Sequence, residues 1–285
     1  MPADWEHLFD LLCAQLSLFL YPHSMQGLGV TRRLRARAKL LLTPRIRLRP
    51  APHEARLCVA AFPGATHLRI VAPHIDLNEV AAAMKSSSIT SLDCNEQPWS
   101  ASSASLAIPP MPHSLREISF SLISVDDIRA LGSLDLRSLS LRFCFVRDVR
   151  PISSLVRLTA LDLGYCSVVD IGPLSPLTAL KDLSLRYCDV VDISPVSSLV
   201  RLHTLDLANT DIVDLKPLST LTALTKLDLA SCHALFDLDP LAALGSLRCL
   251  SIYGCIRISC NARALRSLTA LRSLSAHSSI LPLGM

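Results

Sequence analysis

A pair of apolar residues separated by a single residue recurs through the second half of the chain at a nearly constant step. Its first clear copy is Leu139–Leu141, and it returns every 22 residues as far as Leu227–Leu229. Steps of 23 and 24 residues lead on to Leu250–Ile252 and Leu274–Ala276. A fixed period of about 20 to 50 residues is typical of architectures that stack one small unit many times. The chain is therefore predicted to be a repeat protein.

Earlier copies of the pair are more degenerate. Ile118–Phe120 fits with a step of 21 residues, and Leu92–Cys94 and Leu68–Ile70 are weaker candidates at steps of 26 and 24. We divide the chain accordingly into an N-terminal segment (1–60), degenerate leading repeats (61–114) and the main repeat array (115–285).

One unit shows how such a repeat folds. Leu158, Leu161, Leu163 and Cys166 are spaced as in a short strand with alternate residues on one side. Five further apolar residues follow at intervals of about three, which suits 3₁₀ turns better than a full α-helix; they are Val168, Ile171, Leu174, Leu177 and Leu180. A single unit cannot bury these side chains, so stability must come from stacking neighbours.

Each full unit also carries an aspartate followed three residues later by proline. The pairs are Asp148/Pro151, Asp170/Pro173, Asp192/Pro195, Asp214/Pro217 and Asp237/Pro240. Proline is pre-set for a first helical turn. The aspartates are expected to form a column along one outer edge, as turn caps rather than acid–base pairs.

The composition supports one repeated packing unit. Leucine accounts for 55 of the 285 residues, aromatic residues for only 5%, and glycine for 9 residues. The sequence has no Walker loop and no H-E-x-x-H motif, and Gly27-Leu-Gly29 is followed by Arg32 and Arg33 instead of the glycine of a dinucleotide fingerprint. We expect no enzyme activity, no cofactor and no metal.

The 22-residue step and the D-I-x-P-L turn resemble leucine-rich repeats, in particular those of bacterial internalins and of a regulatory subunit of a Ser/Thr protein phosphatase. The cysteine that follows the strand, as in Gly164-Tyr165-Cys166, is similar to leucine-rich repeat proteins of kinetoplastid protozoa. The resemblance covers 115–285 well and 66–114 loosely. It implies an α/β solenoid, a right-handed superhelix with a concave parallel β-sheet and short 3₁₀ turns and loops on the convex side.

Half of the ten cysteines occupy one position of the repeat, where Thr210 takes the remaining place; they are Cys144, Cys166, Cys188, Cys232 and Cys255. We interpret them as a buried column of small, weakly hydrogen-bonding side chains. Coils about 4.8 Å apart leave disulfides possible by distance, although cytosolic thiols are usually reduced. Cys249, Cys255 and Cys260 give only a faint metal signal, because no C-x-x-C spacing exists.

The repeat phase also assigns the outward face of the sheet. Three of the thirteen aromatic residues are neighbours in one column, Phe143, Tyr165 and Tyr187, with Arg142 and Arg186 beside them. Tyrosine and arginine are enriched in interface hot spots. The predicted protein-binding site on the concave face comprises Phe143, Tyr165, Tyr187, Arg142, Arg186, Asp162, Asp206, Asp228 and Tyr253.

In this hypothesis the three aspartates pair with a basic segment of the partner. The alternative is that the aromatic residues pack on one another merely to cover the sheet.

The N-terminal segment admits several interpretations. Residues 3–21 read as an amphipathic helix that could cap the first coil. A basic run follows, and a nucleic-acid arm would use Arg32, Arg33, Arg35, Arg37 and Lys39. A solvated linker is the plainer interpretation, since interleaved aromatic residues are lacking. If translation began at Met25, residues 25–53 would resemble a mitochondrial transit peptide.

Three further expectations concern location and assembly. The apolar run from Leu8 to Tyr21 is too short to span a bilayer and is preceded by acidic residues, so we expect neither a membrane span nor a secretory signal. The protein is expected in the cytoplasm. The last coil lacks an obvious polar cap, so a partner or a second copy of the chain could cover it.

Overall fold

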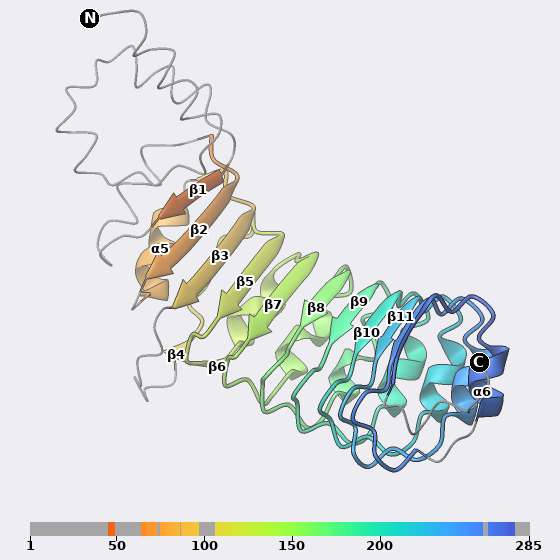
Figure 1. Ribbon diagram of the computed structural model, residues 1–285. Helices are drawn as coiled ribbons and strands as arrows, with labels where there is room; N and C mark the ends of the chain where they lie inside the picture. The colour runs from red at the N-terminus through yellow and green to blue at the C-terminus, as the bar shows by residue number, and fades with distance from the viewer. Residues whose placement is uncertain are drawn as a thin grey trace, which may run out of the picture.

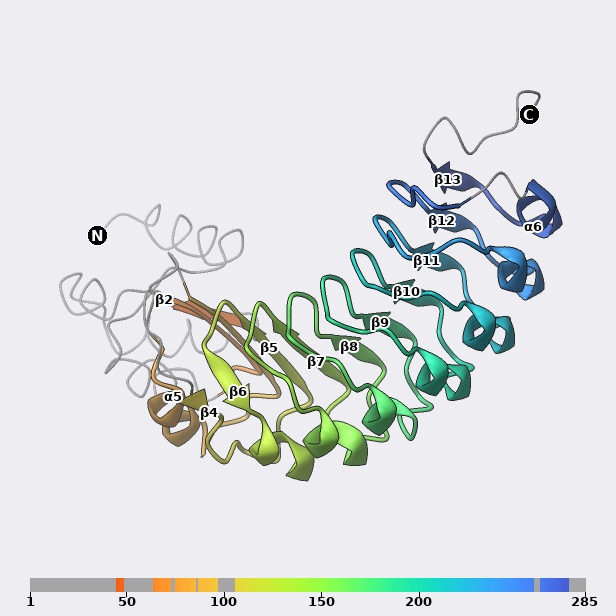
Figure 2. The same ribbon diagram turned by 90° about the horizontal axis from the view of Figure 1, so that it is seen from below.

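The computed structural model describes residues 45–48, 64–72, 75–85, 87–96, 106–258 and 262–276. Within them, parallel strands form one open, curved sheet on the inner side of an arc, and short 3₁₀ helices line the outer side (Figures 1 and 2). This is the solenoid with a concave parallel sheet that the resemblance to leucine-rich repeats implies. The predicted amphipathic helix at 3–21 lies outside the described residues.

The sheet has eleven strands among the described residues, in the order β1-β2-β3-β5-β7-β8-β9-β10-β11-β12-β13. They are β1 (Arg45–Leu48), β2 (His67–Ala72), β3 (Ser91–Glu96), β5 (Glu117–Ser121), β7 (Ser138–Arg142), β8 (Ala160–Asp162), β9 (Asp182–Ser184), β10 (Thr204–Asp206), β11 (Lys226–Asp228), β12 (Cys249–Ser251) and β13 (Ser273–Ser275). A separate pair, β4 (Leu106–Ala107) and β6 (Val125–Asp127), is also parallel.

The register of the sheet confirms the repeat phase. Leu139 is aligned with Leu161, and Leu161 with Leu183. The weaker copies follow the same rule, since Leu68 is aligned with Leu92 and Leu92 with Ile118. Equivalent leucines of successive units are therefore nearest neighbours across the sheet.

A 3₁₀ helix follows the strand in six consecutive coils: η2 (Arg129–Ser133), η3 (Arg150–Ser154), η4 (Gly172–Leu174), η5 (Ser194–Ser198), η6 (Lys216–Thr220) and η7 (Asp239–Ala243). Proline occupies the first turn of η3 to η7. In the unit with Asp170 and Pro173, the residues of the interior series from Val168 to Leu180 are at most 1% exposed. The spacing of three therefore predicted both the helix type and the core.

The leading region departs from a plain repeat in two places. The strand β1 lies within the segment that the sequence assigns to the basic N-terminal part, and its Ile46 is aligned with Leu68 of β2. The α-helix α5 (Leu77–Met84) follows β2; its N-cap Asp76 accepts hydrogen bonds from the backbone N–H groups of Asn78 and Glu79. At the other end of the array, the α-helix α6 (Ala262–Ser267) precedes β13.

No helix among the described residues is long and apolar enough to cross a bilayer.

Candidate functional site

The aromatic column predicted for the concave face forms a continuous stack. The ring centroids of Phe143 and Tyr165 are 4.1 Å apart with an interplanar angle of 18°, and those of Tyr165 and Tyr187 are 4.4 Å apart at 13°. Phe143 is 37% exposed and Tyr187 45%, while Tyr165 between them is half-buried. The rings cover one another and still reach solvent. The stack therefore fits both a protein-binding site and a packing arrangement that only covers the sheet.

The column has an unusual backbone conformation. Phe143, Tyr165 and Tyr187 adopt φ values of 55°, 62° and 55°, in the left-handed region. All members of the column share it; the others are Leu122, Asn209, Ser231 and Gly254. Glycine and asparagine accept this conformation readily, whereas bulky residues are genuine outliers there. The aromatic residues therefore occupy positions whose backbone conformation disfavours bulky side chains.

The cause is the turn that closes each strand. The N–H of Tyr165 donates to the carbonyl oxygen of Arg186 in the next coil, and the N–H of Cys166 donates back to Leu163. The chain must reverse at Tyr165 to satisfy both bonds. The left-handed conformation is thus a demand of the coil, and the sequence signal for it was the presence of Asn209 and Gly254 in the column.

The two predicted arginines lie against the stack. The guanidinium carbon of Arg142 is 5.6 Å from the Phe143 centroid and 5.8 Å from that of Tyr165. The guanidinium carbon of Arg186 is 5.7 Å from the Tyr187 centroid. These separations allow cation–π attraction. The arginines therefore belong to one cluster with the rings.

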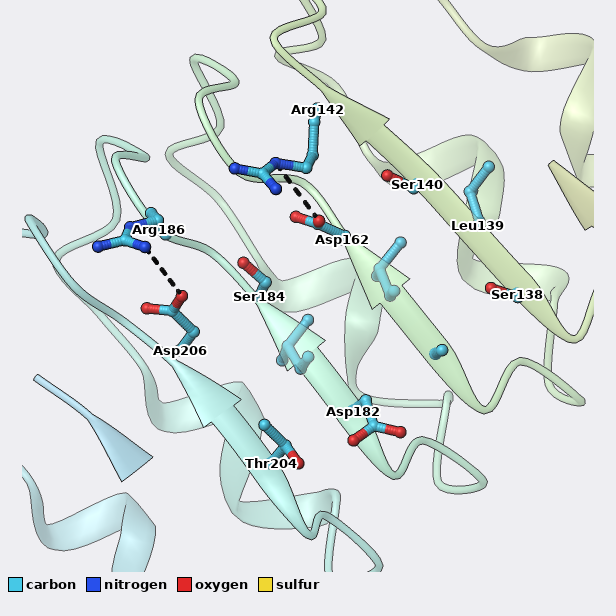
Figure 3. Close-up of a pocket in the computed structure, with 13 residues that line it drawn as sticks. Ser138, Leu139, Ser140, Arg142, Asp162, Asp182, Ser184, Arg186, Thr204 and Asp206 are labelled. Atoms are coloured by element: carbon cyan, nitrogen blue, oxygen red, sulfur yellow. Dashed lines mark ion pairs between the residues drawn. The ribbon is translucent and has the colours of Figure 1, made fainter. Parts of the chain in front are cut away.

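Each arginine also pairs with an aspartate of the following coil. Arg142 Nε lies 3.6 Å from an oxygen of Asp162, and Arg186 Nη1 lies 4.0 Å from an oxygen of Asp206 (Figure 3). Both distances exceed that of a good charged hydrogen bond. Consistently, the buried Nε atoms of both arginines have no hydrogen-bond partner among the described residues.

The aspartates between the strand leucines have a structural task as well. Asp162, Asp206 and Asp228 each accept a hydrogen bond from the backbone N–H two residues later, at 2.9 to 3.0 Å. Burial raises the pKa of Asp206, and the nearby charge of Asp228 acts in the same direction. Two of the three aspartates, Asp162 and Asp206, thus face an arginine of their own chain, which the sequence did not indicate, and at Asp206 the arginine does not offset the effect of burial.

The cluster borders a shallow depression of about 350 Å³ on the sheet. Its lining comes from β7 to β10, and Figure 3 shows Ser138, Ser140, Ser184 and Thr204 together with the two arginine–aspartate pairs. Asp228 lies on the next strand, β11. Tyr253 is exposed but follows β12, three coils beyond Tyr187, so the structure does not bring it into the cluster.

The cysteine column is internal. Cys144, Cys166, Cys188, Cys232 and Cys255 are buried free thiols. The thiols of Cys166 and Cys188 donate to the carbonyl oxygens of Leu141 and Leu163 in the preceding coil, at 3.0 and 3.1 Å. Burial raises the pKa of Cys166 to about 12 and that of Cys188 to about 11. These thiols hold coils together and stay protonated, which suits structure and not nucleophilic chemistry.

The aspartate column serves as turn caps, as predicted. Asp148, Asp170, Asp192, Asp214 and Asp237 each accept from the backbone N–H two residues on, at 2.8 to 2.9 Å. Asp127 does the same for Arg129 at 3.0 Å and extends the column by one coil that the sequence analysis missed.

The histidines of the array lie apart. His203 Nδ1 is 2.7 Å from the carbonyl oxygen of Arg201, and His233 Nδ1 is 3.1 Å from that of Gly254. The described residues contain no group of three or more His, Cys, Asp or Glu side chains placed to hold a metal ion. His277, Cys260 and the basic residues Arg32 to Lys39 lie outside the described residues.

Comparison with known proteins agrees with this architecture. A family model described as leucine-rich repeats, two copies, matches residues 200–243. A search of curated proteins found no match.

Solved structures with a similar fold include leucine-rich repeat proteins. Internalin C2 of Listeria monocytogenes is 22% identical with a TM-score of 0.57, covering 80% of this chain and 93% of its own. The Leptospira interrogans leucine-rich repeat protein LIC12759 is 18% identical with a TM-score of 0.57, covering 80% and 64%. The ectodomain of the receptor kinase GASSHO1/SCHENGEN3 from Arabidopsis thaliana is 20% identical with a TM-score of 0.50, covering 67% and 24%. At these identities the likeness concerns the fold.

Proposed function

We propose that this leucine-rich repeat solenoid is a non-catalytic scaffold that binds a protein partner through its concave face. The binding surface is centred on the stack of Phe143, Tyr165 and Tyr187, with Arg142 and Arg186 beside it. The observation that carries the proposal is the placement of three aromatic side chains, partly exposed, at three consecutive left-handed positions.

The energetics favour a functional reason for these residues. A left-handed conformation costs an L-residue about 1 to 2 kcal/mol, and an aromatic pair contributes about 0.5 to 1.5 kcal/mol beyond its burial. Stacking and left-handed strain are thus of similar size, so stacking by itself gives an aromatic residue little advantage over the Asn209 or Gly254 found in the same column. The left-handed conformation is common to the whole column, Leu122 and Ser231 included, so the support for function is the choice of aromatic residues at three neighbouring positions.

The geometry also suits binding. The rings are held by one another and by the two arginines, so a partner would immobilise few additional rotamers on association. The ring edges and the tyrosine hydroxyl groups meet the partner, because the ring faces within the stack cover one another. The loosely paired guanidinium groups offer donors to acidic or carbonyl groups of the partner, and Asp228, outside the arginine pairs, offers an acceptor to a basic group.

The fold is compatible with this role. The Arabidopsis ectodomain was solved in complex with CASPARIAN STRIP INTEGRITY FACTOR 2, so a solenoid of this kind can present a recognition surface.

We place the protein in the cytoplasm. The support is the set of seven free cysteines among the described residues, six of them buried, since thiols persist in a reducing compartment.

Affinity purification with mass spectrometry tests the proposal by comparing the wild-type chain with Tyr165→Ala/Tyr187→Ala. We expect a specific partner that the wild type captures and the variant loses, with the melting temperature of the variant nearly unchanged. A partner captured equally by both chains would refute the aromatic site.

A further inference from the structure

A second surface lies on the connections that lead from β8, β9, β10 and β11 to the 3₁₀ helices. Its apolar column consists of Val169, Val191, Val213 and Phe236, one residue from each of four consecutive coils. Their side chains are 41% to 60% exposed. We call these four residues, with Asp170, Asp192, Asp214 and Asp237 directly after them, the valine–aspartate flank.

The apolar column is not required by the core. The residue before each member is buried at 0% exposure and already fills the interior of its coil; these residues are Val168, Val190, Ile212 and Leu235. Single exposed apolar residues are ordinary, but contiguous ones mark interaction surfaces. The column also has a defined beginning, because the two preceding coils carry Asp126 and Arg147 at the same position.

The ion pairing of the aspartates changes at the same coil. In the two preceding coils, Arg129 and Arg150 neutralise Asp127 and Asp148 through ion pairs of 2.6 and 2.9 Å. From Asp170 onward, no arginine or lysine of the described chain lies within ion-pair distance of the flank's aspartates. Close arginine–aspartate pairing in this column thus stops where the apolar column starts, and Arg150 acts on Asp170 only from beyond ion-pair distance.

Hydrogen bonds orient the carboxylates that lack an ion pair. One oxygen of each accepts from the backbone N–H two residues later, as in Asp170 to Gly172 at 2.8 Å and Asp214 to Lys216 at 2.9 Å. The second oxygen of Asp192 also accepts from the hydroxyl group of Ser194, at 3.0 Å. The exposed Asp189 and Asp211 add two further negative charges on the same connections. The flank therefore presents an apolar line bordered by ordered negative charge.

We propose that the valine–aspartate flank binds a basic amphipathic helix of a partner protein. The coils are about 4.8 Å apart at the sheet and spread apart toward the convex side (Figure 2). The spacing between neighbouring coils therefore increases from the sheet toward the 5.4 Å rise of one helical turn. Apolar side chains repeating once per turn would meet the apolar column, and flanking lysines or arginines would meet the aspartates.

The probe for the test is a synthetic peptide of about 18 residues, five helical turns, with one leucine stripe bordered by lysines. Its binding to the full chain is measured by fluorescence anisotropy at several salt concentrations. A peptide with the same leucines and glutamate in place of lysine is the control ligand, and it is expected not to bind.

Two double variants with the same added charge provide the matched comparison. Val191→Lys/Val213→Lys changes the flank, whereas Val156→Lys/Val200→Lys changes valines that are 55% and 52% exposed at another repeat position. We expect the first to weaken binding by about tenfold or more and the second to leave it unchanged.

A charge variant separates the two components of recognition. Asp170→Asn/Asp192→Asn/Asp214→Asn retains an oxygen that can accept the turn hydrogen bond, so it is expected to fold normally while binding more weakly and with a shallower salt dependence. Tyr165→Asn/Tyr187→Asn should bind the peptide as the wild type does. This result would show that the valine–aspartate flank binds separately from the concave site. Failure of the wild type to bind, equal loss in both lysine variants, or loss in the tyrosine variant would overturn the proposal.

Discussion

The ring of Tyr165 lies parallel to that of Tyr187 with 4.4 Å between their centroids, although both residues have positive φ values. Two consecutive coils thus have the same left-handed conformation at this position, and the two aromatic side chains are aligned at the surface. The backbone strain of the coil and the stacking of the proposed binding site thus meet in the same two residues. Their balance can be tested by measuring the free energy of unfolding.

Replacing both tyrosines by asparagine, the residue found at position 209 of the same column, should leave stability nearly unchanged. The lost stacking and the relieved strain are each of order 1 kcal/mol and oppose one another. Chemical denaturation should therefore show a free energy of unfolding within about 1 kcal/mol of the wild type. A loss of several kcal/mol would mean that the stack mainly supports the fold.

The converse substitution, Asn209→Tyr, places a fourth ring beside Tyr187. It should lower the free energy of unfolding or leave it unchanged, because a favourable left-handed residue is replaced by a strained one. A clear gain in stability would show that stacking outweighs strain and would remove the energetic argument for function.

The turn caps give a second stability prediction. Asp170→Ala deletes the acceptor for the N–H of Gly172 and should cost about 0.5 to 2 kcal/mol. Asp170→Asn keeps an acceptor at the same place and should cost less. Equal losses in both variants, measured by thermal unfolding, would show that the charge of the column matters more than the hydrogen bond.

The buried thiols predict a pH dependence at alkaline pH. Burial raises the pKa of Cys166 to about 12 and that of Cys188 to about 11, above the ordinary value of 9.0. The folded chain then holds protons that the unfolded chain loses. Their contribution to stability is complete below about pH 9 and declines as the pH rises toward 11 to 12, by about 1.4 kcal/mol per pH unit for each thiol.

The matched variant for this prediction is Cys166→Thr/Cys188→Thr, which copies the residue present at position 210. The difference in unfolding free energy between wild type and variant should shrink or reverse from pH 9 to pH 11, because other alkaline titrations are common to both chains. A difference that is constant with pH would contradict raised pKa values at these cysteines.

The sequence predicted the repeated part of the fold well because the period of the leucines determines which residues align. The alignment of Leu161 with Leu183 and the 3₁₀ helices that begin at proline both follow from local spacing. The strand β1 was missed although Arg45 to Leu48 alternate charged and apolar residues. The overall basic character of that segment obscured a pattern of period two.

The candidate site could be predicted only in part. The repeat phase brought Phe143, Tyr165 and Tyr187 together, and the structure confirms their adjacency. Their left-handed backbone was not predicted, because it arises from hydrogen bonds between coils. The pairing of Arg142 with Asp162 depends on how a long side chain crosses to the next coil, which spacing along the chain does not determine.

Site-specific photocrosslinking tests the central claim most directly. A photoreactive phenylalanine derivative replaces Tyr187 in one chain and Val200, similarly exposed on another part of the coil, in a second chain. Both chains are irradiated with the partner identified by affinity purification. A protein that binds through the concave face should be crosslinked at position 187 and not at position 200. Crosslinking at position 200 alone, with none at position 187, would contradict the proposed site.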